Sequence, residues 1–288
     1  MLLIMKVGTL LLQALAASHY PSFTHNFSRI VPLRKFHAVV KSGTPVDDPI
    51  QSLVNMLSSE VGRHASGGHK ATPVALKKCL EQLDLVTLQH VQLTPLDMLG
   101  MNNGSGFCYT LYETHEVAVS AFMIPAGGCI PLHNHPNMTV LTKLLSGNLM
   151  VRSFSELEEA EPNNSILAAL DDGVDKEGVL RRATEPAWAL TPRSGNFHEL
   201  YAVSNSLMLD VFLPPYDNAK GRCCTYFKIV SDESVSSRKI TASRHSGFTP
   251  IKDKTVRLIP ASKKEEHDLA QYLPIAIPYY GRRYRVPD

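Results

Sequence analysis

The sequence lacks several features that would place it in a specialised structural class. None of its five cysteines forms a Cys-x-x-Cys pair, and their odd number favours a reducing compartment over a disulfide framework. No run of 18 apolar residues is present, which argues against a membrane span. The net charge of +2 is too small to predict a nucleic-acid surface. The composition is that of an ordinary globular protein, with 44% hydrophobic and 19% charged residues among 288.

The first 46 residues contain no acidic residue at all. Their five basic residues are Lys6, Arg29, Arg34, Lys35 and Lys41. The apolar start followed by Ser, His and Arg is compatible with a mitochondrial presequence, a secretory signal or an untargeted, disordered extension. We expect a cytoplasmic protein, with a mitochondrial location as the alternative that this basic leader leaves open.

Residues 47–288 are expected to form one domain. Apolar residues at helical spacing predict N-terminal helices within about 48–85. From about 92 to 250 the chain is rich in β-branched and aromatic residues punctuated by Gly, Pro and Asn, which predicts an antiparallel sandwich or barrel. The stretch Ser155–Glu185 is acidic and then basic, and it is interpreted as a surface insertion or a pair of loops.

Two histidines, His133 and His135, stand one residue apart in a predicted strand. Alternate residues on a strand face the same side, so both imidazoles can converge on one metal ion. A lone His-x-His pattern is a weak signal, because histidine is also an ordinary partly buried residue.

The flanks of this pair resemble the first cupin motif, with Gly127 before the histidines and Gly147 after them. The segment "TPRSGNFHEL" resembles the second motif and supplies His198. The two motifs together imply a mainly β fold, the cupin double-stranded β-helix or jelly-roll barrel, behind the N-terminal helices. They also imply a metal bound by His133, His135 and His198.

The glutamate of the first motif is replaced by Val140. Three neutral imidazoles leave the charge of a divalent ion uncompensated and several coordination positions free. Such a site favours an anionic thiolate together with an amine and O2, although imidazole alone suits iron, zinc, copper and nickel alike.

The region from about Gly106 to Val230 resembles the 2-aminoethanethiol (cysteamine) dioxygenase and plant cysteine oxidase family. The segments that carry the resemblance are "IPLHNHPNMTVLTKLLSGNLMVRSF", "NFHELYAV", "LDVFLPPYD" and "GRCCTYF". The insertion between the histidine motifs and the tail "PYYGRRYRVPD" make the animal cysteamine dioxygenases look nearer than the plant enzymes.

The resemblance implies a non-haem Fe(II) enzyme that uses O2 to oxidise a thiol to a sulfinate. Its expected partners are cysteamine, which gives hypotaurine, and peptides with an N-terminal cysteine; a monomer without nucleic-acid or membrane partners is expected. Two other hypotheses stay open: a cupin that binds a metal or ligand without catalysis, and a cupin enzyme that oxidises carbon.

Four further residues are candidates for catalytic roles. Asp210, in an otherwise apolar strand, either orients the substrate amine or a ligand histidine, or pairs with an arginine or a backbone amide. Tyr216 either hydrogen-bonds oxygen or peptide atoms at the barrel mouth, or is an ordinary half-buried tyrosine. Cys224 and Tyr226 match the pair that forms a thioether cross-link in animal family members; Cys224 is otherwise a small buried hydrophobe.

Overall fold

The structure is a computed structural model that describes residues 48–62, 72–93, 106–158, 165–230, 248–270, 273–276 and 284. The interpretation of residues 1–46 as a leader lies outside these residues. Within the described ranges, no helix is long and apolar enough to cross a membrane.

The N-terminal helices begin where the sequence supplies caps. Helix α2 (Pro49–Gly62) starts after Asp48, whose Oδ1 accepts a hydrogen bond from the Ile50 amide at 2.9 Å. Helix α3 (Pro73–Asp84) starts after Thr72, whose Oγ1 accepts from the Ala75 amide at 3.2 Å. The described residues also contain α4 (Leu88–Val91), the 3-10 turn η3 (Asn218–Lys220) and α5 (Lys263–Leu269).

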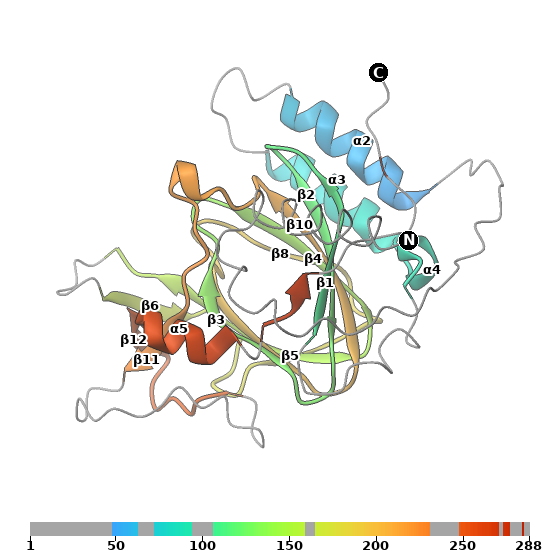
Figure 1. Cartoon of the computed structure of the whole chain (residues 1–288). Coiled ribbons are helices and arrows are strands. Elements are labelled where there is room, and N and C mark those ends of the chain that lie inside the picture. Colours follow the sequence, from blue (N-terminus) through green and yellow to red (C-terminus); the bar gives the residue numbers. More distant parts are fainter. Residues whose placement is uncertain are drawn as a thin grey trace, which may run out of the picture. The chain divides into compact units, whose positions relative to one another are not determined.

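Two sheets form the body of the fold (Figure 1). The first has the order β13-β1-β2-β10-β4-β8, and its strands are β13 (Ile275–Ala276), β1 (Phe107–Glu113), β2 (Ala118–Ile124), β10 (Ser206–Leu213), β4 (Thr139–Ser146) and β8 (Trp188–Leu190). The second has the order β11-β12-β6-β5-β9-β3, with β7 also paired to β5. Its strands are β11 (Phe227–Val230), β12 (Thr255–Pro260), β6 (Ile166–Leu170), β5 (Asn148–Glu156), β9 (Phe197–Ala202), β3 (Cys129–Asn134) and β7 (Val179–Arg182).

Several consecutive strands cross from one sheet to the other. The succession β2, β3, β4, β5 and again β8, β9, β10, β11 alternates between the sheets, which is the double-stranded β-helix that the motifs implied. Gly147 makes the corner between β4 and β5 with φ +84°, and a Cβ there would clash with the Asn205 carbonyl oxygen. The predicted fold class is confirmed.

The two faces of the first sheet have different partners. Val119, Leu141 and Leu209 pack with the apolar residues of α2 and α3 in one buried cluster. Alternate residues therefore point the other way, toward the second sheet. Ser120, Asp210 and Thr142 are register neighbours on β2, β10 and β4, so they form a buried polar row on that inner face.

Two sequence interpretations are wrong in detail. The segment Ser155–Glu185 is not only loops, because it contains β6 and β7, which pair with β5. Cys224 and Tyr226 lie before strand β11, which begins at Phe227, and Tyr226 forms an isolated bridge with His133. The second sheet also continues past residue 250 through β12, which pairs with β6 and β11.

Candidate metal centre

The three histidines come from two neighbouring strands of the second sheet. His133 on β3 lies opposite His198 on β9, and His135 follows directly after β3 ends. The Asn196 side chain holds the His135 backbone, because its Oδ1 accepts from the His135 amide at 3.2 Å and its Nδ2 donates to the His135 carbonyl at 2.8 Å. The structure thus brings together all three histidines that the motifs selected.

Their Nε2 atoms point at one another. The Nε2 of His198 lies 3.1 Å from the Nε2 of His133 and 3.1 Å from that of His135. Nitrogens at this spacing could bind one ion with metal–nitrogen bonds of about 2.1 Å. The residues present therefore fit a first-row metal held by three nitrogens.

Hydrogen bonds to two of the outer ring nitrogens select the metal-binding tautomer. The Nδ1 of His133 donates to the Pro131 carbonyl at 2.8 Å, which leaves its Nε2 as a lone-pair donor. Tyr216 donates its hydroxyl proton to the Asn134 carbonyl at 2.9 Å, so its oxygen accepts from Nδ1 of His135 at 2.7 Å. Tyr216 is thus a partner of a ligand histidine.

Burial keeps these imidazoles neutral. It lowers the pKa of His133 to about 4, and it lowers the pKa values of His135 and His198 well below the ordinary range, assisted by the neighbouring rings. In the part of the chain that the structure describes, no carboxylate belongs to the cluster. Val140, at the position of the motif's glutamate, lies instead in an apolar cluster with Met138 and Phe212.

Asp210 faces the barrel interior with a partner that the sequence did not suggest. Its Oδ1 accepts a hydrogen bond from Thr142 Oγ1 at 2.6 Å, where an arginine or a backbone amide was one expectation. Burial raises the pKa of this carboxyl to about 7, although the Thr142 bond opposes the rise. Two positions along β10, Phe212 stacks on the His135 ring with 6.0 Å between centroids. Asp210 therefore lies on the strand face that borders the histidines.

Cys224 lies between two tyrosines. Its thiol is within hydrogen-bond reach of the Tyr216 and Tyr226 hydroxyls, and burial raises its pKa to about 11. The Tyr226 ring is 6.0 Å from the His133 ring between centroids. The structure thus places all four proposed catalytic residues on the barrel interior or beside the histidines, while their roles and the cross-link stay predictions.

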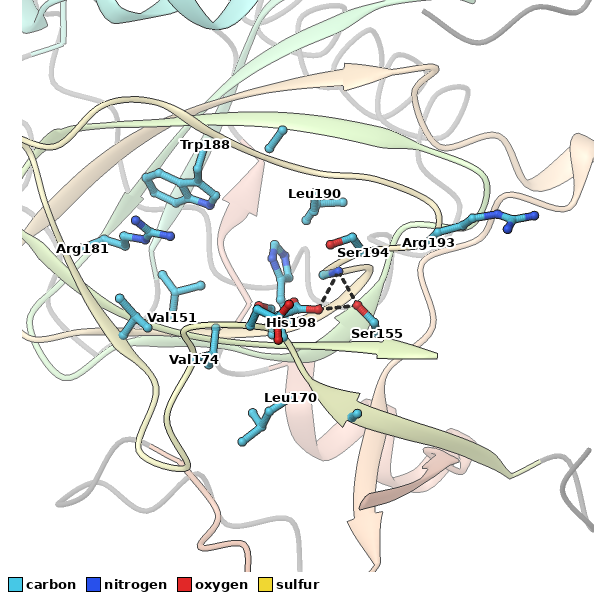
Figure 2. A pocket seen from close by; sticks show the side chains of 17 residues that line it. Val151, Ser155, Leu170, Val174, Arg181, Trp188, Leu190, Arg193, Ser194 and His198 are labelled. Carbon is cyan, nitrogen blue, oxygen red and sulfur yellow. Dashed lines mark hydrogen bonds between the residues drawn. The ribbon is translucent and has the colours of Figure 1, made fainter. Parts of the chain in front are cut away.

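A cavity of about 460 Å³ has His198 in its lining (Figure 2). Its walls include Arg181 on β7, Trp188 on β8, Arg193, and Asp171 just after β6. In Figure 2, Trp188 and Arg181 lie together on one side of His198, and Arg193 lies on the other. Sequence reasoning missed these residues: Arg181 and Asp171 come from the stretch interpreted as loops, and Trp188 and Arg193 follow it.

Comparisons with known proteins agree with this site. The PCO_ADO family model matches residues 99–269, which is more than half of the chain. Plant cysteine oxidase 1 of Arabidopsis thaliana is 38% identical over 128 residues, 44% of this chain and 43% of the plant protein. The 2-aminoethanethiol dioxygenase of Mus musculus is 33% identical over 135 residues, 42% of this chain and 53% of the mouse protein. The chain thus spans about half the length of the curated relatives it matches.

The chain is thus similar both to a plant cysteine oxidase and to an animal 2-aminoethanethiol dioxygenase. That it is nearer to the animal enzymes stays a prediction. Among solved structures, an RmlC-like cupin from Shewanella frigidimarina is 15% identical and covers 41% of this chain and 84% of its own, with a TM-score of 0.30. The double-stranded β-helix fold is assigned from the order of the strands in the two sheets. By the family match, this chain belongs to the PCO_ADO family.

Proposed function

We propose that the protein is an Fe(II)-dependent thiol dioxygenase that acts on a 2-aminoethanethiol group. The substrate is cysteamine, the N-terminal cysteine of a peptide, or both. The observation that carries the proposal is the convergence of three buried neutral nitrogens with no carboxylate in the described cluster. Family membership and relatives named plant cysteine oxidase and 2-aminoethanethiol dioxygenase support it.

Iron is the metal that best suits both the ligands and the reaction. Imidazole nitrogens accept zinc, copper, nickel and iron, so the donor set alone does not choose among them. Incorporation of O2 requires a redox-active ion, which removes zinc. When bound, iron would supply the thiolate binding and O2 activation that transfer both oxygen atoms to sulfur.

The chain's own residues prepare this chemistry. Pro131 and Tyr216 hold the outer nitrogens of His133 and His135, so that their Nε2 lone pairs would face a bound ion. Asp210, as a carboxylate, would accept a hydrogen bond from the substrate ammonium on the inner face of β10. Its raised pKa of about 7 means that both protonation states are populated at neutral pH. Apolar neighbours such as Val140 and Phe212 exclude water from the ligands.

The test is oxygen consumption and product mass with iron-loaded protein. Cysteamine and a Cys-Gly-led peptide should each gain two oxygen atoms at sulfur, and His198→Ala should abolish the gain. His115→Ala is the matched control, because this side chain is 79% exposed in the turn between β1 and β2. A non-catalytic cupin would bind iron and leave both thiols unchanged, whereas a carbon-oxidising enzyme would put oxygen elsewhere in its product.

Three further statements are proposals of the same kind. Residues 47–288 are expected to act as one catalytic domain, in a cytoplasmic and monomeric protein. Sedimentation of the purified chain tests the monomer. Microscopy of a carboxy-terminal fusion tests the cytoplasmic location against the mitochondrial alternative.

A further inference from the structure

Gly195, the glycine of the second histidine motif, is held by side chains from two other parts of the second sheet. Its amide donates to Ser155 Oγ on β5 at 3.1 Å and to Asp171 Oδ1, just after β6, at 3.2 Å. The Ser155 hydroxyl donates to the same Asp171 oxygen, and dashed lines in Figure 2 mark this network. Hydrogen bonds to a carboxylate are stronger than those between neutral groups, so Asp171 fixes the backbone at Gly195.

The network requires a glycine at this position. Gly195 has φ +67°, and a Cβ there would lie 3.0 Å from Asp171 Oδ2. The Asp171 amide also donates to the Ser153 carbonyl at 3.2 Å, and Ser153 is the register partner of His198. The carboxylate is therefore anchored to β5 beside a ligand histidine, where it would crowd any larger residue at position 195.

The residue after Gly195 connects this network to the metal ligands. Asn196 holds the His135 backbone with both polar atoms of its side chain, at 3.2 and 2.8 Å, and its Nδ2 also donates to the Thr191 carbonyl at 3.3 Å. His198 follows two residues later on β9. A shift of the backbone at Gly195 would therefore move the clamp on His135 and the start of the strand that carries His198.

We propose that Asp171 is a positioning residue for the metal centre: it fixes the backbone at Gly195, so that Asn196 holds His135 and β9 presents His198. Asp171 is not a member of the histidine cluster, so it acts through the backbone and not as a ligand. The inference deepens the proposed function and rests on its metal site, but not on the thiol chemistry.

A pair of neighbouring aspartates gives a matched test. Asp171→Ala removes the carboxylate, and Asp172→Ala is the control, because Asp172 is exposed, also lines the cavity and takes part in none of these bonds. In competition with a chromophoric chelator, we expect Asp171→Ala to lower Co(II) affinity by about tenfold, the lower end of the range for lost partners of metal ligands. Asp171→Asn should keep most of the affinity, because its amide oxygen can accept the same hydrogen bonds. Asp172→Ala should bind Co(II) as the wild type does.

Further measurements separate positioning from stabilisation of the fold. A purely structural role would lower the unfolding free energy of the metal-free protein, measured in urea, and leave Co(II) affinity unchanged. If Asp171 acts through Asn196, the affinity losses of Asp171→Ala and Asn196→Ala should not multiply in the double variant. The visible absorption of bound Co(II) depends on ligand geometry and should change in Asp171→Ala and not in Asp171→Asn. Should Asp171→Ala not fold, Ser155→Ala removes one acceptor of the Gly195 amide and should weaken Co(II) binding by a smaller factor.

The outcomes separate the two proposals. Wild-type Co(II) affinity in Asp171→Ala (or in Ser155→Ala, if the former does not fold), equal losses in Asp171→Ala and Asp171→Asn, or fully multiplicative losses in the double variant overturn the role of Asp171. If the wild-type protein binds metal with this dependence on Asp171 but oxidises neither thiol, only the proposed function fails. A wild-type protein that binds neither Co(II) nor Fe(II) overturns both.

Discussion

Tyr216 Oη lies 2.7 Å from Nδ1 of His135, and the same hydroxyl donates to the Asn134 carbonyl at 2.9 Å. The turn after β10 is therefore bonded to the end of β3. These two hydrogen bonds place the proton of His135 on Nδ1 and leave its Nε2 free to bind a metal.

We expect Tyr216→Phe to weaken metal binding. Removing the hydroxyl leaves Nδ1 of His135 without its acceptor, and loss of such a partner costs about ten- to hundredfold in metal affinity. Competition with a chromophoric chelator for Co(II) or Fe(II) measures the change. Tyr201→Phe on β9 is the control and should bind as the wild type does; equal affinity in both variants would contradict the role of the Tyr216 bond.

Loss of a ligand should have a larger effect than loss of its partner. We expect His198→Ala to lower metal affinity by more than about a hundredfold, because its Nε2 faces both other histidines at 3.1 Å. The same chelator competition applies, with His115→Ala as control. Near-wild-type affinity of His198→Ala would remove this residue from the metal site.

The pH dependence of stability should report Asp210. Its pKa in the folded protein is about 7, above its unfolded value, so the folded state holds the proton more tightly. Its stabilisation is complete below the unfolded pKa and is lost as the pH rises through about 7. The neighbouring side chains of Thr142, Ser120 and Cys108 add no charge that would change this pH dependence. The two hydroxyls are uncharged, and burial raises the pKa of the Cys108 thiol to about 12.

Asp210→Asn removes this titration. Between pH 5 and 8.5, the metal-free wild type should lose about 2–3 kcal/mol of unfolding free energy relative to the variant. Urea unfolding at the two pH values measures it. Parallel pH profiles for the two proteins would show that Asp210 is ionised in the folded state throughout this range.

The sequence predicted the three ligand histidines but not the hydrogen bonds that orient them. Side chains two apart on a strand share a face, so His133 and His135 were identified together, and the second motif added His198. The Tyr216 bond depends on where the turn after β10 lies in space, which no local pattern encodes. Arg181 and Trp188 were missed because β7 and β8 are short and half-buried, and pairing with β5 and β4 defines them rather than hydrophobic periodicity.

A buried lysine should stabilise the contact between helix α3 and the barrel. Lys143 Nζ donates to Asp84 Oδ1 at 3.0 Å and to the Glu185 carbonyl at 2.7 Å. Asp84 Oδ1 also accepts from the Ala187 amide, next to Trp188. We expect Lys143→Met to cost about 2 kcal/mol in unfolding free energy, since one partner is partly exposed. Lys77→Met, in the exposed pair with Glu81, is the control and should cost no more than about 0.5 kcal/mol.

The thioether cross-link between Cys224 and Tyr226 is a prediction that mass analysis can test. The Cys224 thiol interacts with the Tyr226 hydroxyl, and the predicted thioether would join the sulfur to the ring carbon beside that hydroxyl. Formation of the C–S bond removes one hydrogen from sulfur and one from the ring, and O2 accepts the two electrons and protons. After incubation with Fe(II), O2 and a thiol substrate, peptide mapping should find the segment around Cys224 lighter by two hydrogen atoms. Cys224→Ala should lack the loss and Cys223→Ala should retain it, because Cys223 is exposed and has no such contact. A segment of unchanged mass in active wild-type protein would show that catalysis here proceeds without the cross-link.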